Sequence, residues 1–144
     1  MSSEPDDSFG VTFLVRHAWL SLRSAVAVAL VEHGLSVQQY GALLVLTHHP
    51  GRTVAELGRV VGTARQSANE LVTGLEKADL VERRPNPNDR RTQQLFLTKA
   101  GVDRLAVAAP AVLAVEAEIE ASLADADRTT ARDWLAHMVR NAGR

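Results

Sequence analysis

The chain lacks cysteine, contains few aromatic residues and carries a formal net charge of only −1. The absence of cysteine excludes disulfides, thiol redox chemistry and cysteine-ligated metals. Because aromatics make up 4% of the residues and hydrophobic residues 46%, the core must consist mainly of alanine, valine and leucine. A net charge so close to zero does not by itself indicate a nucleic-acid-binding protein.

Signatures of enzymes, metal sites and membrane spans are also missing from the sequence. It has no glycine-rich phosphate loop, no His-Glu-x-x-His pattern and no spacing typical of a catalytic triad. The histidines are scattered, so we expect no metal site. Because the enzyme motifs are missing, we also expect no cofactor and no enzymatic activity. No apolar run approaches membrane-spanning length, and the segment Ser2–Asp7 is an acidic tail rather than a basic signal-peptide start. We expect a soluble cytoplasmic protein with one domain.

Two helical patterns separated by a tight turn begin at Thr53. Thr53 followed by Glu56 is a capping box, in which hydroxyl and carboxylate satisfy backbone N–H groups at a helix start. Gly62 is suited to the left-handed backbone that ends a helix. Thr63 with Gln66 repeats the capping pattern and predicts a second, longer helix. The two helices around this corner have the order of a helix-turn-helix.

A hairpin is predicted after this pair of helices. Two strands, at about 80–84 and 94–97, flank a cluster of turn-forming residues at 85–89 that is too long for a two-residue turn. Arg52 could add a short third strand. Helix, turn, helix and hairpin in this order outline a winged helix-turn-helix.

The rest of the chain is predicted to be helical. A helix over about 8–33 ends at Gly34, and Ser36 with Gln39 caps another over 37–48. A long helix runs from 99 to about 124, a break follows at 125–127, and a last helix covers about 128–141. The predicted fold class is therefore mainly α with a small β-hairpin wing.

The wing carries the most specific pattern in the sequence. Asp89-Arg90-Arg91, followed by a strand and by Leu97-Thr98-Lys99-Ala100-Gly101, resembles the wing signature of the MarR family of bacterial transcriptional regulators. The two preceding helices fit the family as well, and the match covers nearly the whole chain. The resemblance implies a winged helix-turn-helix region, 35–98, embedded in a helical dimerisation region formed by 1–34 and 99–144.

The resemblance also implies a function. We expect a homodimeric regulator, most often a repressor in this family, that binds a pseudo-palindromic operator with half-sites about one helical turn apart. A small aromatic or anionic effector at the hinge would change the operator affinity. Glu70 and Gly74 depart from the family, whose members often carry a basic residue at these places, and Asp79 stands where a glycine is common. The alternative is a MarR-like protein that has lost sequence-specific DNA binding and acts through protein–protein interaction.

The candidate DNA-binding residues lie on the second helix and in the hairpin. An arginine pairs with guanine and a glutamine or asparagine with adenine in the major groove, whereas a wing arginine suits the minor groove. Asp89 orients Arg91 or the turn, and Arg83 and Arg84 alternate along a strand, so only one of them is expected to face a phosphate. The alternative to DNA contact for the second helix is that its polar face is simply exposed to solvent and that Gln66 caps the helix start. The candidates are Arg65, Gln66, Ser67, Asn69, Thr73, Arg84, Asp89, Arg90 and Arg91.

Candidate effector-binding residues are Arg16, His17, Trp19 and Tyr40. They could line the cleft between the dimer frame and the winged module, where members of the family bind small anions. Their helical periodicity equally allows them as core or interface residues.

Overall fold

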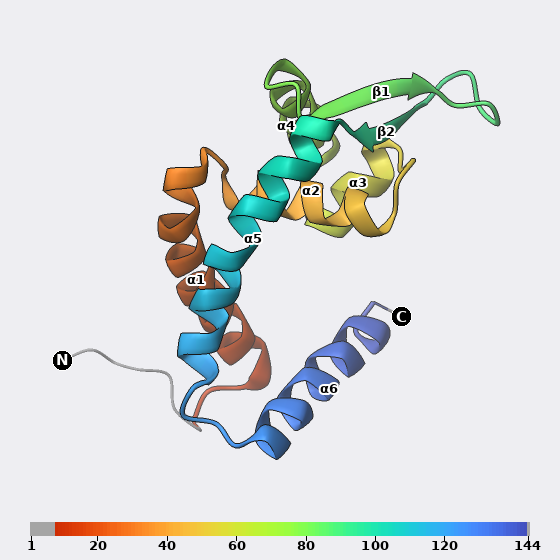
Figure 1. The fold of residues 1–144 in the computed structure, drawn as a ribbon. Helices are drawn as coiled ribbons and strands as arrows, with labels where there is room; N and C mark the ends of the chain where they lie inside the picture. The colour runs from red at the N-terminus through yellow and green to blue at the C-terminus, as the bar shows by residue number, and fades with distance from the viewer. Residues whose placement is uncertain (1–7, 144) are drawn as a thin grey trace. The chain divides into compact units, whose positions relative to one another are not determined.

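The computed structural model describes residues 8–143, so the acidic segment Ser2–Asp7 lies outside the described residues. Figure 1 shows helices throughout, with a single two-stranded hairpin among the described residues, which confirms the predicted fold class. The chain divides into two compact units, 1–112 and 113–144. The elements are α1 (Val11–Leu30), the 3-10 helix η1 (Val31–His33), α2 (Val37–His48), α3 (Val54–Val61), α4 (Arg65–Lys77), β1 (Val81–Pro85), β2 (Gln93–Leu97), α5 (Lys99–Glu120) and α6 (Asp125–Asn141).

The first unit has a core of aliphatic side chains, as the shortage of aromatics predicts. Leu30, Leu43, Leu57, Leu75 and Leu95 are completely buried, and they come from five different elements. No polar or charged side chain is buried among the described residues. Helices α3 and α4 and the hairpin are therefore attached to one apolar core, on which they keep a fixed geometry.

The start of α2 follows the predicted capping box. Gln39 N donates to Ser36 Oγ at 3.0 Å, and Ser36 N donates to Gln39 Oε1 at 2.9 Å. Both hydrogen bonds satisfy backbone or side-chain groups that helix formation would leave unpaired. The predicted bounds of this helix, 37–48, are confirmed.

The corner between α3 and α4 differs from its prediction. Gly62 ends α3 with a φ of 77°, as predicted. However, Thr63 N donates to Gly58 O at 2.9 Å, so Thr63 belongs to the end of α3. The N-cap of α4 is Ala64, which makes no side-chain capping bond. The prediction of a capping box formed by Thr63 and Gln66 was therefore wrong. Gln66 is consequently not used as a cap.

The capping box predicted for Thr53 and Glu56 is only half formed. Glu56 N donates to Thr53 Oγ1 at 3.2 Å, as predicted. The Glu56 carboxylate does not reach back to the backbone; it accepts from the Thr53 hydroxyl at 3.1 Å and from Arg52 Nη1 at 2.9 Å. The adjacent arginine competes for the carboxylate because a charged donor makes the stronger hydrogen bond.

Antiparallel pairing of β1 with β2 builds the wing, with Arg83 opposite Leu95 and Arg84 opposite Gln94. Thr53 forms an isolated bridge with Gln94, and Leu95 N donates to Arg52 O at 2.9 Å. The expected short third strand is thus present as a single bridge. The loop beyond the strands extends outward from the hairpin (Figure 1).

The end of α4, the start of β1 and the start of α5 meet at Leu80. Asp79 has a φ of 60°, which is why a glycine would be favoured at this place and why the short polar aspartate is tolerated. Thr98 Oγ1 donates to Asp79 O at 2.6 Å, and Thr98 N donates to Leu80 O at 3.1 Å. A Cβ added to Gly101 would lie 2.1 Å from Leu80 O. Only glycine therefore fits at Gly101 without movement of the backbone.

In the second unit, α6 starts three residues earlier than predicted, at Asp125. The segment 125–127 was predicted as a break, but its two aspartates occupy the first helical turn. Negative side chains are favourable there because the helix dipole is positive at its N-terminus. No described residue of α6 is buried. Its tryptophan, Trp134, and its neighbour Leu135 are 44% and 49% exposed.

The first helix also differs from expectation. The segment Val11–His33 is long and apolar enough to cross a membrane, by length and composition alone. The expectation that no apolar run approaches such a length was wrong, because the test averages hydropathy over a window that tolerates a few charged residues. The core helix of a soluble protein and a signal sequence pass the same test. Of the 18-residue window that meets it, 11% is buried, which leaves an apolar surface on α1.

Replacing Gly101 tests the junction at Leu80. Gly101→Ala is expected to lower the free energy of unfolding by about 1–3 kcal/mol, because the new methyl group forces the backbone of Leu80 to move. Gly41 is the matched control: it lies inside α2 with nothing within 4 Å of an added Cβ. Gly41→Ala is expected to stabilise by about 0.5–1 kcal/mol. Urea unfolding of both variants gives the comparison, and equal stabilities would contradict the proposed close contact.

Candidate nucleic-acid interface

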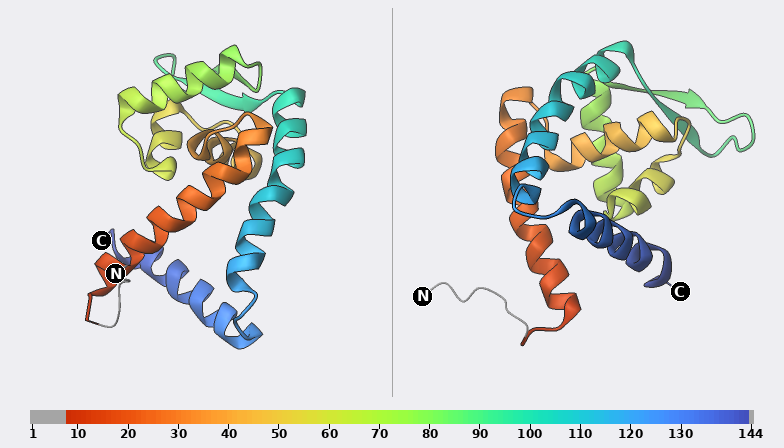
Figure 2. Two further views of the ribbon diagram at one scale, coloured as in Figure 1. Left: turned by 90° about the vertical axis from the view of Figure 1, so that its left-hand side faces the viewer. Right: turned by 60° about the horizontal axis from the view of Figure 1, so that its bottom comes forward.

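Helix α4 presents a polar face made of two rows of side chains. Its buried side consists of Ala68, Val72 and Leu75. Residues four apart lie above one another on a helix. One row is therefore formed by Arg65, Asn69 and Thr73, and the other by Gln66, Glu70 and Gly74. In the left view of Figure 2, α4 (light green) lies on the outer side of the first unit.

The two rows border a shallow hollow of about 770 Å³. Arg65, Gln66 and Asn69 are exposed, and Ser67 is exposed on the same helix. Asn69 Nδ2 donates to Arg65 O at 3.1 Å, which leaves the amide oxygen and one N–H group for a ligand. The predicted helix residues Arg65, Gln66, Asn69 and Thr73 are thus brought together around one open surface.

A second, smaller hollow of about 170 Å³ lies between α4 and the hairpin. Its lining includes three arginines: Arg65 from α4, Arg83 from β1 and Arg91 from the wing loop. Arg65 makes no ion pair within residues 8–143. Three guanidinium groups around one hollow form a positively charged surface suited to phosphate.

The two neighbouring arginines of β1 point to opposite sides. Arg83 donates from Nη2 to Thr73 Oγ1 and from Nε to Glu76 Oε1, both at 3.4 Å, so it faces α4. Arg84 instead lies over the ring of Phe96, 4.2 Å from its centroid, and forms an ion pair with Glu82. The sequence analysis expected only one of the pair to face a phosphate and named Arg84 as the candidate. Arg83 lines the hollow, and Arg84 does not.

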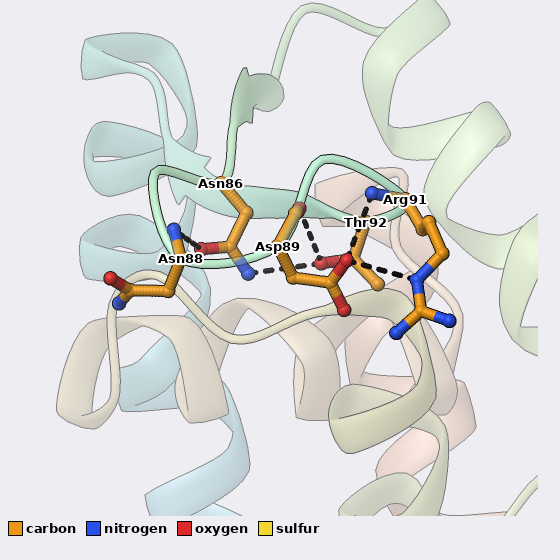
Figure 3. A network of polar contacts seen from close by, with 5 residues as sticks. All are labelled: Asn86, Asn88, Asp89, Arg91 and Thr92. Carbon is orange, nitrogen blue, oxygen red and sulfur yellow. Dashed lines mark hydrogen bonds and ion pairs between the residues drawn. The ribbon is translucent and has the colours of Figure 1, made fainter.

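The wing loop holds Arg91 through Asp89. Asp89 Oδ1 accepts from Arg91 N at 2.9 Å and from Arg91 Nε at 3.2 Å (Figure 3). Asn86 and Thr92 close the loop, with Asn86 Nδ2 donating to Thr92 Oγ1 at 2.9 Å. The Arg91 side chain is 91% exposed. The loop therefore presents an oriented guanidinium group to solvent, with Arg90 exposed beside it.

Beside the wing, Glu56 binds Arg52. The hydrogen bond from Arg52, supported by the Thr53 hydroxyl, holds the pKa of Glu56 below its ordinary value of 4.5. Glu56 thus remains ionised at neutral pH, and its charge partly neutralises Arg52. Arg52 is therefore a weaker candidate for phosphate contact than Arg65, which has no acidic partner among the residues described.

An apolar cavity of about 520 Å³ lies on the other side of β1. Arg84 is its one charged lining residue, and Phe96 stacks against that guanidinium group. Leu44 and Thr47 of α2 and Leu105 of α5 line it as well. A cavity of this size with a single cationic group suits a small ligand that combines an apolar body with a negative charge.

The residues predicted to bind an effector do not line this cavity. Arg16, His17 and Trp19 lie on α1, where the His17 ring is 4.2 Å from the ring of Phe13. Trp19 is 50% exposed, and Tyr40 is half-buried in α2. Sequence analysis missed Arg84 and Phe96 as cavity residues, because their meeting depends on which face of the hairpin packs on α2 and α5.

Comparison with known families and proteins points to transcriptional regulation. The model of the MarR family matches residues 33–92, which extend from η1 to the wing. A protein of Thauera aromatica whose name connects it with transcriptional regulation of the hcr operon is 33% identical over 110 residues, with 76% of this chain and 66% of that protein covered. The uncharacterized HTH-type transcriptional regulator YdcH of Bacillus subtilis is 32% identical over 114 residues, covering 76% of each.

Solved structures share the fold over almost the whole chain. The transcriptional repressor CouR, bound to a 23-mer DNA duplex, has a TM-score of 0.77 and 27% identity, covering 99% of this chain and 100% of that one. The Mycobacterium tuberculosis MarR family protein Rv2887, in complex with salicylic acid, has a TM-score of 0.76 and 26% identity, covering 92% of this chain and 98% of that one. These relatives and fold neighbours are transcriptional regulators rather than enzymes.

Proposed function

The chain belongs to the MarR family of transcriptional regulators, and we propose that it is a repressor that binds a pseudo-palindromic DNA operator as a homodimer in the cytoplasm. The observation that carries this proposal is the hollow between α4 and the wing, bordered by Arg65, Arg83 and Arg91. A helix beside a positively charged wing fits a major groove and the adjacent phosphates. The repressor CouR, which has the same fold and is bound to a DNA duplex, supports DNA as the ligand.

The two parts of the interface take different roles in this proposal. Arg65, Gln66 and Asn69 read base edges from α4, with Ser67 and Thr73 in supporting contacts. Arg91, oriented by Asp89, enters the minor groove next to the half-site, where narrow segments concentrate negative potential. Arg83 takes the phosphate contact, and Arg90 contributes charge at the wing tip.

Exposed apolar surface supports the homodimer. In the second unit, Trp134, Leu135 and Val139 lie on one side of α6 with exposures of 44%, 49% and 84%. In the first unit, α1 exposes Phe13, Trp19 and other large apolar side chains. Exposed apolar side chains that gather in large patches usually mark an interface. A second copy of the chain is the partner that the proposed two-fold operator requires.

The cavity beside Arg84 is the proposed effector site. An aromatic carboxylate would place its ring among Leu44, Phe96 and Leu105 and its charge on Arg84, in exchange for the Glu82 carboxylate that Arg84 now binds. The salicylic acid complex of Rv2887 supports this ligand class. Binding there would favour a conformation with lower operator affinity.

The wing gives the test of DNA binding. Arg91→Ala is expected to weaken binding to the operator, identified by footprinting upstream of the protein's own gene, and to flatten the plot of log K against log salt by about 0.9. Its melting temperature should not change, because the side chain is 91% exposed. Asp89→Ala should weaken binding less, and Arg23→Ala, on the exposed face of α1, serves as the charge-matched control. An unchanged affinity and slope for Arg91→Ala would favour the interaction-protein alternative.

Dimerisation is expected to depend on the apolar side of α6. Changing Trp134 and Leu135 together to Asp places two charges on that side and should produce monomers in light scattering at micromolar concentration, because unpaired charges are not tolerated in a buried interface. Thr129→Asp on the same helix is the control and should leave a dimer. A dimer of unchanged stability in the double variant would rule out this surface.

Arg84→Ala tests the effector site with salicylate as the probe. The variant should bind the operator as wild type does, while the salicylate concentration needed for release rises roughly tenfold or more, since a charge-assisted hydrogen bond is lost. Arg16→Ala is the comparison, because Arg16 belongs to the other candidate set. Loss of the response in Arg16→Ala alone would move the effector site to α1, and weakened operator binding by Arg84→Ala would show that Arg84 contacts DNA.

A further inference from the structure

We propose that Glu70 reads a cytosine in the major groove of each half-site and is a specificity-determining residue for operator recognition, an inference that rests on the proposed DNA binding. The position of Glu70 on α4 is the first observation that supports this assignment. Gln66 precedes Glu70 by one turn, and Gly74 follows it by one turn. All three line the larger hollow on α4, whereas neither Gln66 nor Glu70 lines the smaller hollow beside the wing.

Glu70 has no partner within the described part of the protein. The other carboxylates on α4 and the hairpin are engaged: Glu76 binds Arg83, Glu82 binds Arg84, and Asp89 binds Arg91. Glu70 makes no ion pair and no side-chain hydrogen bond there, and it is exposed. Its acceptor capacity is therefore fully available in the middle of the helix face that would enter the groove.

The surface beside Glu70 is open. A Cβ added at Gly74 would have Gln39 Nε2 as its nearest neighbour, 4.0 Å away, so the position one turn beyond Glu70 is empty rather than filled by packing. A base edge can therefore approach the carboxylate closely from this side. The glycine lowers helix propensity but removes the side chain that would separate this part of α4 from the base pairs.

The chemistry of a carboxylate selects one base. An ionised carboxylate only accepts hydrogen bonds, and cytosine N4 offers a donor in the major groove with no acceptor on the major-groove edge of the same base. Adenine N6 also donates, but the acceptor N7 lies beside it. Guanine and thymine present acceptors and would be repelled. Because the phosphates also repel a carboxylate, Glu70 adds affinity only at the matching base and costs affinity elsewhere, which gives discrimination.

Selection from a pool of randomised DNA duplexes tests the assignment, with wild type, Glu70→Gln and Glu70→Ala treated in parallel. The wild type is expected to select half-sites with an invariant cytosine at one position, and replacing that cytosine by thymine should weaken binding roughly five- to hundredfold. Glu70→Gln should accept adenine there, because an amide both donates and accepts. Glu70→Ala should accept any base at that position while the rest of the half-site is unchanged. Glu32→Gln, on η1, is the matched control.

The possible results separate this inference from the function on which it rests. A wild type that selects no consensus would overturn both. A wild-type consensus that both Glu70 variants reproduce at every position would overturn the role of Glu70 alone. Tighter binding of Glu70→Ala to all sequences, with base preferences unchanged, would also overturn it, because the carboxylate would then act only by repelling phosphates. Thermal unfolding confirms that the exposed substitutions leave the fold intact.

Discussion

The backbone carbonyl of Leu80 fixes the geometry of the reading head, because three elements meet at it. It accepts a hydrogen bond from Thr98 N at 3.1 Å, and it lies so close to Gly101 that a side chain there would clash with it. Leu80 N closes the end of α4 by donating to Leu75 O at 2.9 Å. Leu80 thus lies between the end of α4 and the start of β1 and contacts the first turn of α5. A change at this point is expected to alter the angle between α4 and the wing, on which the proposed contact with both grooves depends.

Ion pairs around the wing orient the arginines more than they stabilise the fold. Asp89 holds Arg91 while leaving it 91% exposed, and an exposed pair of this kind contributes at most about 1 kcal/mol to stability. Its value is preorganisation, because a side chain already held in place loses less conformational entropy on binding. Glu76 and Thr73 have the same effect on Arg83 from the side of α4. The proposed interface is thus prepared by one contact within the wing loop and by the contacts of Arg83 with α4.

Local sequence patterns predicted the elements well where one interaction dominates. Ser36 and Gln39 have no competitor for the start of α2, and the capping box forms. Thr63 has the same pattern, but Gly62 places it at the end of α3, and the hydrogen bond to Gly58 takes precedence. The clustered aspartates from Asp125 were predicted to break the chain between helices. They instead occupy the first turn of α6, where the helix dipole favours negative charge. The predictions failed where two local signals compete over the same few residues.

Side-chain direction in the site depends on packing that no local pattern contains. Alternation along β1 requires Arg83 and Arg84 to face opposite ways, and only the docking of the hairpin on α4 decides which faces the helix. That docking gives the strand two functions in the proposed mechanism. Arg83 borders the DNA-reading hollow, and Arg84 borders the apolar cavity. Adjacent residues of one strand thus connect the proposed effector site to the proposed DNA site, so a ligand that repositions Arg84 acts on the strand that carries Arg83 and leads into the wing.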